Sequence, residues 1–454
     1  MLILAAISLI NHAFSISESE MSAVAYLNGA SLSKSTAADD SVFPFDGVTR
    51  TNADVHDPSI VEFNGTYVLV HTSGHEFCAM RTSKDLKTWK EWSSIMAPPD
   101  WLKTAVPQHR SVWAPAPLKV GKALRVYYCA SQQFGSNTSF IGMAENANFN
   151  PDKPLEGWVD KGKLLESKAG TDNFNAIDPD VFVDQKGRHW MSYGSYWSGL
   201  YMVELEAKTG LRLDTKPPIH IASNTGERGN PLEAPYLCYR EGYYYLFVVY
   251  GLAAQGVRST YRMMVGRSKS MEEPFVGFDG KPMTEGGHTA LLKSSPPMYA
   301  PGGGNIFRDK DGTLKLAYHF YDGRKYWHRD MWGRPVMQVR DIVWGKDSWP
   351  LPGLPVGAEL GRSEKGVAGQ WIHQADFGDA TTIELTSDGK IKSGERTGAW
   401  KQEGDQLTFT WPPSGRSTES FEDKLQLAYD GRYYVGRNRA GAVIRGILRD
   451  AAKR

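Results

Sequence analysis

Five segments of this chain begin alike, with a polar or small residue, a proline, a strand-like run, a glycine turn and a second, aromatic run. Successive prolines of the five segments stand 56 to 66 residues apart. A period of this length indicates a repeat architecture, because each repeat is one supersecondary unit that buries its apolar face against its neighbours. The five starts are Asp57-Pro58, Ala114-Pro115, Asp178-Pro179, Ala234-Pro235 and Ala300-Pro301.

Each repeat carries the signals of a β-hairpin. In the first, apolar runs at residues 60–63 and 67–71 flank Asn64-Gly65, the strongest short hairpin signal. Further strand-like stretches such as residues 261–268 lie between the hairpins, and long helical periodicity is scarce. About four strands in each of five units predict an all-β fold whose main part, residues 46–350, is a five-bladed β-propeller.

The competing β-sandwich predicts strands at intervals of about 8–12 residues but no longer period. In a propeller, the first strand of each blade lines a central channel, so we expect the five starts to converge at one mouth of that channel. Proline suits a strand start because its missing N–H removes no ladder hydrogen bond there.

The 60-residue pattern stops near residue 350. Residues 350–353 (Pro-Leu-Pro-Gly) read as a linker. Residues 351–454 then contain short alternating runs with hairpin turns at Asp388-Gly389 and Asp430-Gly431. They predict a separate small antiparallel β-barrel or sandwich, which has no acid cluster of its own and either binds polysaccharide or supports the propeller.

The composition argues against some classes of binding partner. A formal net charge of +1 over 454 residues provides no basic field for nucleic acid or an anionic membrane. Aromatic residues form 12% of the chain and offer flat faces on which a ligand can stack. The three cysteines, Cys78, Cys129 and Cys238, lack the close spacing of a zinc site and are predicted to be free core cysteines.

The N-terminal residues 1–45 read as a leader or a loose arm. An apolar run at residues 2–10 has the length of a signal-peptide core and is too short to span a bilayer. No Lys or Arg precedes Lys34, so the signal is ambiguous. We expect a secreted or periplasmic, monomeric protein without a transmembrane segment.

Three of the five starts carry a carboxylate, namely Asp57, Asp178 and Glu233. The predicted fold brings them to one channel mouth, where burial and mutual repulsion push their pKa values apart. Two carboxyl groups on either side of a bond are what glycoside hydrolysis requires. An Asp before Pro is often only a turn residue, but three acids in register favour the catalytic interpretation.

Six stretches in order resemble glycoside hydrolase family 43, and within it the endo-α-1,5-L-arabinanases, over about residues 50–350. The resemblance implies a five-bladed propeller that cleaves internal α-1,5-linked bonds of plant cell-wall arabinan or arabino-oligosaccharides with inversion. An exo-acting arabinofuranosidase, a β-xylosidase of the same fold and a non-catalytic sugar-binding propeller are the alternatives. The stretches are residues 55–59 (VHDPS), 112–115 (VWAP), 175–180 (NAIDPD), 194–199 (GSYWSG), 233–236 (EAPY) and 318–322 (YHFYD).

The resemblance also implies residue roles. Asp57 is expected to be the general base, Glu233 the general acid, and Asp178 the third acid, which orients Glu233 and keeps its pKa high. Asp180 lies on the same strand face as Asp178 and is the alternative candidate for the third acid. Substrate contacts are expected from five residues, although Trp113 and Trp197 also suit core packing between blades. These five are His56, Trp113, Asn175, Ser195 and Trp197.

A calcium ion, held mostly through waters, is implied at His319. Without the resemblance, a lone strand histidine is more often a hydrogen-bonding core residue, and calcium prefers oxygen ligands. The run Gly302-Gly303-Gly304 suits either a close approach of a ligand to the backbone or a flexible turn. Ala116 departs from the family, in which an Asp often follows the Trp-Ala-Pro of blade two.

Overall fold

The computed structural model describes residues 55–74, 76–107, 112–324, 335–358, 360, 366–413 and 419–449. Five four-stranded antiparallel sheets follow one another along the chain, and a closed antiparallel barrel of eight strands comes after them. The predicted all-β architecture is therefore confirmed, and the C-terminal part is a barrel, not a sandwich. The predicted leader, residues 1–45, lies outside the described residues.

Each sheet is one blade, with its strands in sequence order from the inside outwards. Blade one consists of β1 (His56–Phe63), β2 (Thr66–Thr72), β3 (Ala79–Ser83) and β4 (Trp89–Ser94), and blade two of β5 (Trp113–Val120), β6 (Ala123–Ser131), β7 (Ser139–Asn146) and β8 (Trp158–Ser167). Blade three consists of β9 (Asp180–Val183), β10 (His189–Tyr193), β11 (Leu200–Leu205) and β12 (Ile219–Ala222), and blade four of β13 (Leu232–Arg240), β14 (Tyr243–Tyr250), β15 (Arg262–Ser268) and β16 (Thr289–Leu292). Blade five consists of β17 (Met298–Arg308), β18 (Leu314–Asp322), β19 (Pro335–Trp344) and β20 (Pro350–Pro355).

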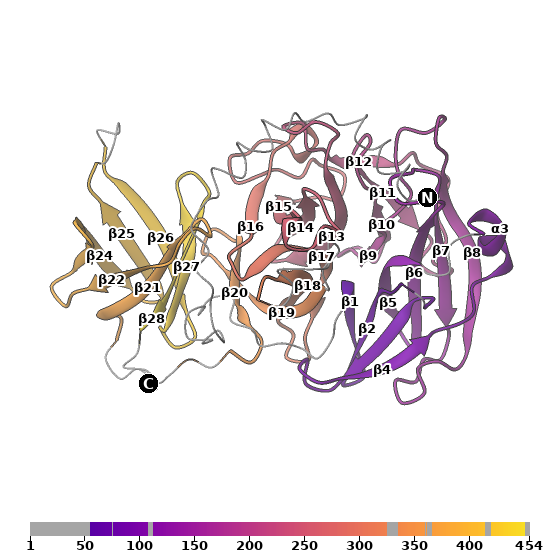
Figure 1. Ribbon diagram of the computed structural model, residues 1–454, viewed down its shortest axis with the longest axis horizontal. Helices are drawn as coiled ribbons and strands as arrows, with labels where there is room; N and C mark the ends of the chain where they lie inside the picture. The colour runs from indigo at the N-terminus through magenta and orange to yellow at the C-terminus, as the bar shows by residue number, and fades with distance from the viewer. Residues whose placement is uncertain are drawn as a thin grey trace. The chain divides into compact units, whose positions relative to one another are not determined.

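The first strands of the blades close into a ring. β1 contacts β5 and β17, β9 contacts β5 and β13, and β13 contacts β17. In Figure 1 these inner strands lie around the middle of the propeller and the fourth strands lie at its edge. Each pair of neighbouring blades shares a buried apolar cluster, including the pair of blades one and five, where the rings of Tyr67 and Phe307 pack edge to face. The cores therefore lie between blades, and the channel remains for polar groups.

Helices are few among the described residues, as the sequence predicts. They are α3 (Asp100–Ala105), between blades one and two, and the short 3-10 turns η2 (Gly256–Arg258) and η3 (Met283–Glu285) of blade four. In the part of the chain that the structure describes, none is long and apolar enough to cross a membrane.

The prediction of a linker at residues 350–353 was wrong. Residues Pro350–Pro355 form β20, the outermost strand of blade five. Proline is tolerated at a sheet edge because the N–H it lacks would face away from the ladder, so a Pro-rich strand can look like a linker in sequence.

The barrel consists of β21 (Gly369–Ala375), β22 (Thr381–Leu385), β23 (Lys390–Ser393), β24 (Arg396–Glu403), β25 (Gln406–Trp411), β26 (Phe421–Ala428), β27 (Tyr433–Asn438) and β28 (Val443–Leu448). Pairing of β21 with β28 closes it. Its interior is packed with large side chains such as Trp371, Phe409 and Tyr434, all at most 1% exposed. Propeller and barrel belong to one compact unit, and the Tyr433 hydroxyl donates to the Pro352 carbonyl of β20 (2.6 Å).

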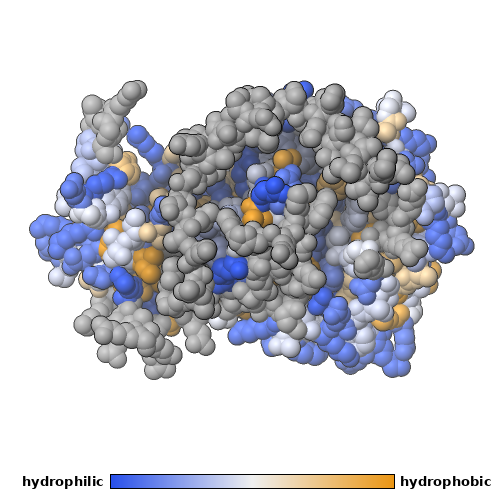
Figure 2. Space-filling model, viewed as in Figure 1, coloured by the Kyte–Doolittle hydropathy of each residue, from blue (hydrophilic) through white to orange (hydrophobic). Residues whose placement is uncertain are grey.

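The described surface is mostly hydrophilic on the face seen in Figure 2, where hydrophobic residues form small separate patches. Among the described residues, the exposed large hydrophobic side chains are Phe134, Val159, Leu211 and Leu252. Scattered apolar residues of this kind are normal on a water-exposed protein.

Candidate active site

The five predicted starts share a backbone feature that the sequence does not reveal. Each residue before the marker proline has a left-handed conformation, with φ between 37° and 55°. In blades one, two, four and five a β-bulge or register shift lies at the same place. A bulge re-aims a side chain, and here it turns the start residues toward the channel. The five residues are Asp57, Ala114, Asp178, Ala234 and Ala300.

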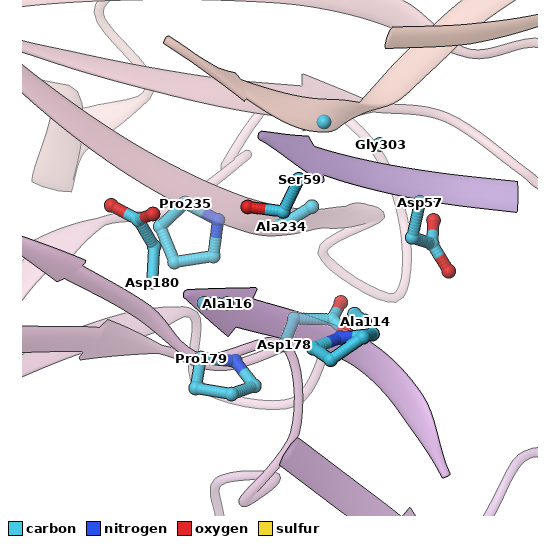
Figure 3. A pocket seen from close by; sticks show the side chains of 12 residues that line it. Asp57, Ser59, Ala114, Ala116, Asp178, Pro179, Asp180, Ala234, Pro235 and Gly303 are labelled. Atoms are coloured by element: carbon cyan, nitrogen blue, oxygen red, sulfur yellow. The ribbon is translucent and has the colours of Figure 1, made fainter. Parts of the chain in front are cut away.

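A pocket opens where these starts meet (Figure 3). Four of the five left-handed residues line it, together with the prolines of blades two, three and four. Asp180 lies at the other side of the pocket from Asp57, beside Pro235. Ala116 lines the pocket too, so the position where the family often has an Asp presents a methyl group to it.

Asp57 is held by two donors. The His56 Nδ1 and the Thr72 hydroxyl each lie 2.7 Å from Asp57 Oδ2. Burial opposes ionisation, but the neighbouring His56 and these hydrogen bonds outweigh it and hold the pKa of Asp57 well below its usual range. Asp57 is therefore a carboxylate at neutral pH.

The pKa of Glu233 is shifted in the opposite direction to that of Asp57. Burial, helped by the negative charge of Asp57, raises the pKa of Glu233 to about 7, against the opposing effect of a hydrogen bond from Ser195. The Ser195 hydroxyl lies 2.6 Å from Glu233 Oε2. Glu233 therefore keeps its proton up to neutral pH.

Asp178 is the third acid of the group. Burial first, and then the charges of Glu233 and Asp57, raise the pKa of Asp178 well above its usual range. Its carboxyl accepts the backbone N–H of Ala234, the residue after Glu233. Asp180, the alternative candidate for this role, also lines the pocket; it accepts the N–H of Leu237 (3.1 Å) and has a pKa raised by burial to about 7.

The structure places the five expected substrate residues differently. His56 adjoins Asp57, and Ser195 is 2% exposed and directed at Glu233. Asn175 is also 2% exposed, outside the residues that line the pocket. Trp113 packs in part against the core between blades two and three. Trp197 stays half-buried on the loop between β10 and β11, where its carbonyl accepts Asn230 Nδ2 (2.9 Å).

His319 is fully buried in β18 beside the first blade. Its Nδ1 accepts the backbone N–H of Asp57 (3.2 Å), and its ring stacks on His56 with centroids 3.9 Å apart. The Nε2 atoms of both histidines are buried with no partner among the described residues. Buried polar atoms normally have a hydrogen-bond partner, so these two nitrogen atoms mark a place where a ligand or an ordered water would bind.

His56, Asp57 and His319 offer ligand atoms within 4.8 Å of one another, so this group could hold a metal ion. Two imidazoles and one carboxylate are a nitrogen-rich set, whereas calcium prefers oxygen. The donors therefore fit a calcium ion only if it keeps several of its own waters.

Gly303 explains the glycine run of blade five. It lies inside strand β17 with φ +51°, so the flexible-turn interpretation was wrong. A Cβ on Gly303 would lie 2.7 Å from His319 Cε1 and would also contact Asp57 Oδ1. The close approach that requires glycine is thus made by two residues of the site.

Thr72 and Cys129 were missed by the sequence reasoning. Thr72 Oγ1 accepts the N–H of Ala114 (2.8 Å) while donating to Asp57, and Cys129 Sγ accepts the N–H of Asp178 (3.3 Å). A signal existed, because each stands 15 residues after the start residue of its own blade, Asp57 or Ala114.

One carboxyl group with a lowered pKa and others with raised pKa values, brought together from three blades, supply the acid and base that glycoside hydrolysis requires. The sequence profile described as "Glycosyl hydrolases family 43" matches residues 51–350. The chain therefore belongs to this family.

Known relatives agree with the assignment. The extracellular endo-α-(1→5)-L-arabinanase 1 of Bacillus subtilis is 33% identical over 304 residues, 66% of this chain and 88% of the relative. An extracellular exo-α-(1→5)-L-arabinofuranosidase of Cellvibrio japonicus is 30% identical over 307 residues, 65% of this chain and 86% of the relative.

Solved structures show the same fold. A family 43 endo-arabinanase from Bacillus licheniformis has a TM-score of 0.59 at 33% identity and covers 68% of this chain and 99% of its own. An endo-1,5-α-L-arabinanase from Thermotoga petrophila reaches 0.72 at 22% identity and covers 87% of this chain and 98% of its own. The wider coverage of the second structure extends the likeness in fold beyond the propeller.

Proposed function

We propose that this protein is an inverting glycoside hydrolase that cleaves internal α-1,5-linked L-arabinofuranosyl bonds of arabinan. The opposite pKa shifts of Asp57 and Glu233, which lie near enough for the charge of Asp57 to raise the pKa of Glu233, carry the proposal. The two relatives described above, named an α-(1→5)-L-arabinanase and an α-(1→5)-L-arabinofuranosidase, support the substrate class.

In the proposed mechanism, Asp57 is the general base. It removes a proton from a water that attacks the anomeric carbon from the face opposite the leaving group. His56 and Thr72 hold the Asp57 carboxylate in one orientation through their hydrogen bonds to Oδ2. Attack on the opposite face inverts the configuration of the anomeric carbon.

Glu233 is the general acid in this proposal. Its pKa of about 7 leaves a proton that it gives to the glycosidic oxygen as the bond breaks. Asp178 orients Glu233 through the N–H of Ala234, which the Asp178 carboxyl accepts. Proton exchange with water then restores both groups.

A calcium ion is proposed at the group of His56, Asp57 and His319, bound mostly through its waters. It would supply positive charge beside Asp57, and the chain's own part is to supply the unpartnered Nε2 atoms of both histidines.

We also propose a secreted, monomeric enzyme. The names of both relatives above describe extracellular proteins. The N-terminal sequence of protein collected from culture medium and its mass in solution test these two proposals, and a cell-retained or dimeric protein would contradict them.

The experiment for the activity is a product profile on linear arabinan, xylan and an aryl arabinofuranoside. Short arabino-oligosaccharides from arabinan are expected. Free arabinose as the sole product would instead favour the exo action of the Cellvibrio relative. Glu233→Ala should lower turnover by roughly 10²–10⁴-fold, the contribution of general acid catalysis, with an unchanged circular dichroism spectrum. An unchanged turnover rate in Glu233→Ala would contradict the proposal.

A further inference from the structure

The backbone N–H groups of the left-handed starts are held by acceptors on other segments of the chain. Asp57 donates to His319 Nδ1 of blade five (3.2 Å), and Ala114 donates to Thr72 Oγ1 of blade one (2.8 Å). Asp178 donates to Cys129 Sγ of blade two (3.3 Å). In these three cases the acceptor belongs to the preceding blade, so each start is tied to its neighbour in the ring.

Cys129 occupies in blade two the position that Thr72 occupies in blade one. Thr72 is the register partner of His56, and Cys129 is the register partner of Trp113; both partners directly precede a left-handed residue. Thr72 Oγ1 accepts the N–H of the next blade's start, Ala114 (2.8 Å), and Cys129 Sγ accepts the N–H of the next blade's start, Asp178 (3.3 Å). The two residues therefore hold the start of the following blade in the same way, and in the case of Cys129 that start is an acid of the site.

The thiol of Cys129 makes two polar contacts. Its S–H donates to the Trp113 carbonyl (3.2 Å), and its sulfur accepts the Asp178 N–H. Burial, together with the charges of Asp178 and Asp57, raises the pKa of Cys129, so the S–H remains to make the first contact. Sulfur contacts are weak, but this side chain is fully buried, where an unpartnered N–H is costly.

We propose that Cys129 is a positioning residue for Asp178, and through it for Glu233. The inference rests on the proposed function, because it names what holds the third acid of that site. The path runs from the Cys129 sulfur to the Asp178 N–H, and from the Asp178 carboxyl to the Ala234 N–H next to Glu233. The alternative, purely structural role is that Cys129 only fills space in the core cluster between blades two and three.

Three variants separate the two interpretations. Cys129→Ala removes both polar contacts, and Cys129→Ser restores a donor and an acceptor. Cys238→Ala truncates another buried cysteine of an inner strand, four residues beyond the start Ala234 in β13 and packed in the core between blades four and five. Positioning predicts that Cys129→Ala lowers kcat at least roughly tenfold with KM little changed, since small misplacements of a catalytic group are costly. Cys129→Ser should recover most of that loss, and Cys238→Ala should keep wild-type kcat.

The second readout needs no substrate. Hydrogen exchange of the Asp178 amide, measured by mass spectrometry on peptides that span it, should be slow in the wild type and in Cys129→Ser and fast in Cys129→Ala. An Asp178 amide equally protected in Cys129→Ala would overturn the inference. So would equal impairment of kcat by Ala and Ser, because then volume rather than hydrogen bonding decides. If wild-type protein cleaves no arabinan, the proposed function fails, and the exchange rates alone decide the role of Cys129.

Discussion

Removing the Ser195 hydroxyl should move the basic limb of the pH–rate profile upward. Ser195 Oγ donates to Glu233 Oε2 across 2.6 Å, and this hydrogen bond opposes the rise in the pKa of Glu233 caused by burial and by Asp57. The donor favours the ionised form of the acid. Ser195→Ala therefore raises the pKa of Glu233 above its present value of about 7.

The size of the shift follows from the energy of the bond. A hydrogen bond to a charged group contributes about 1.5–3 kcal/mol, and one pKa unit corresponds to about 1.4 kcal/mol. Part of the bond survives with the protonated acid, so we expect a shift of about one unit. Because the acid acts in its protonated form, the variant should retain activity to higher pH than the wild type.

The loop that carries Ser195 should stay in place in the variant. The Tyr196 N–H donates to the Leu232 carbonyl (2.8 Å), and Ser195 and Glu233 form a backbone bridge. Ser192→Ala is the matched control, because Ser192 is a buried serine of the same blade whose hydroxyl donates to the Pro235 carbonyl (3.2 Å) and not to an acid.

The assay is kcat/KM for linear arabinan over a pH series, because this quantity reports the free enzyme. The position of the basic limb, not the height of the profile, carries the result, since Ser195→Ala can also lower the maximum. A limb that stays in place, moves to lower pH, or moves equally in Ser192→Ala would refute the assignment of Glu233 as an acid tuned by Ser195.

Three further predictions follow from the site. Gly303→Ala should abolish most activity because its Cβ would displace Asp57 and His319, whereas Gly312→Ala, also at positive φ (+84°) but with open space, should keep activity; equal kinetics for the two would contradict this. Asp180→Asn should reduce the loss of stability on raising the pH: burial raises the pKa of Asp180 in the folded state to about 7 from its ordinary value of 3.8, so the wild type loses stability as the pH rises between these two values. This loss in the free energy of unfolding of the wild type is at most about 4 kcal/mol. Urea unfolding at acidic and alkaline pH measures it, and an equal change with pH in the wild type and in Asp180→Asn would contradict the prediction. Exhaustive chelation should lower kcat, with recovery on adding calcium, and full activity after metal removal would exclude a role for an ion at His56, Asp57 and His319.

The fold could be predicted because its signals repeat. One Asn-Gly turn, as at Asn64-Gly65, indicates only a hairpin, but five hairpin units at one period indicate blades, and the structure has five. The prediction that Asp57 and Asp178 face one channel followed from the same period, because they hold equivalent positions in a closed ring, and Glu233 stands one residue before the equivalent position Ala234. Local sequence was enough because each blade start is coded by its own few residues.

What the sequence did not reveal are the contacts between blades. The N–H groups of Ala114 and Asp178 are held by residues 42 and 49 positions earlier in the chain. Neither Thr72 nor Cys129 belongs to a chemically distinctive motif, so only their shared spacing from the blade starts could have pointed to them. Ser195 was expected to contact substrate, but its hydroxyl is committed to Glu233 in the structure.

The left-handed starts connect the fold to the chemistry. A non-glycine residue in this conformation costs about 1–3 kcal/mol, so five such residues represent a strain that the blade packing must offset. The strain aims the start residues into the pocket, where Asp57 and Asp178 bring carboxyl groups and Ala114 and Ala234 leave room. The repeat places four of its five start residues in this pocket; two of them carry carboxylates, and Glu233 stands one residue before the start Ala234. Ala114 and Ala234 therefore matter to the proposed site as well, since larger side chains at these two positions would fill the pocket.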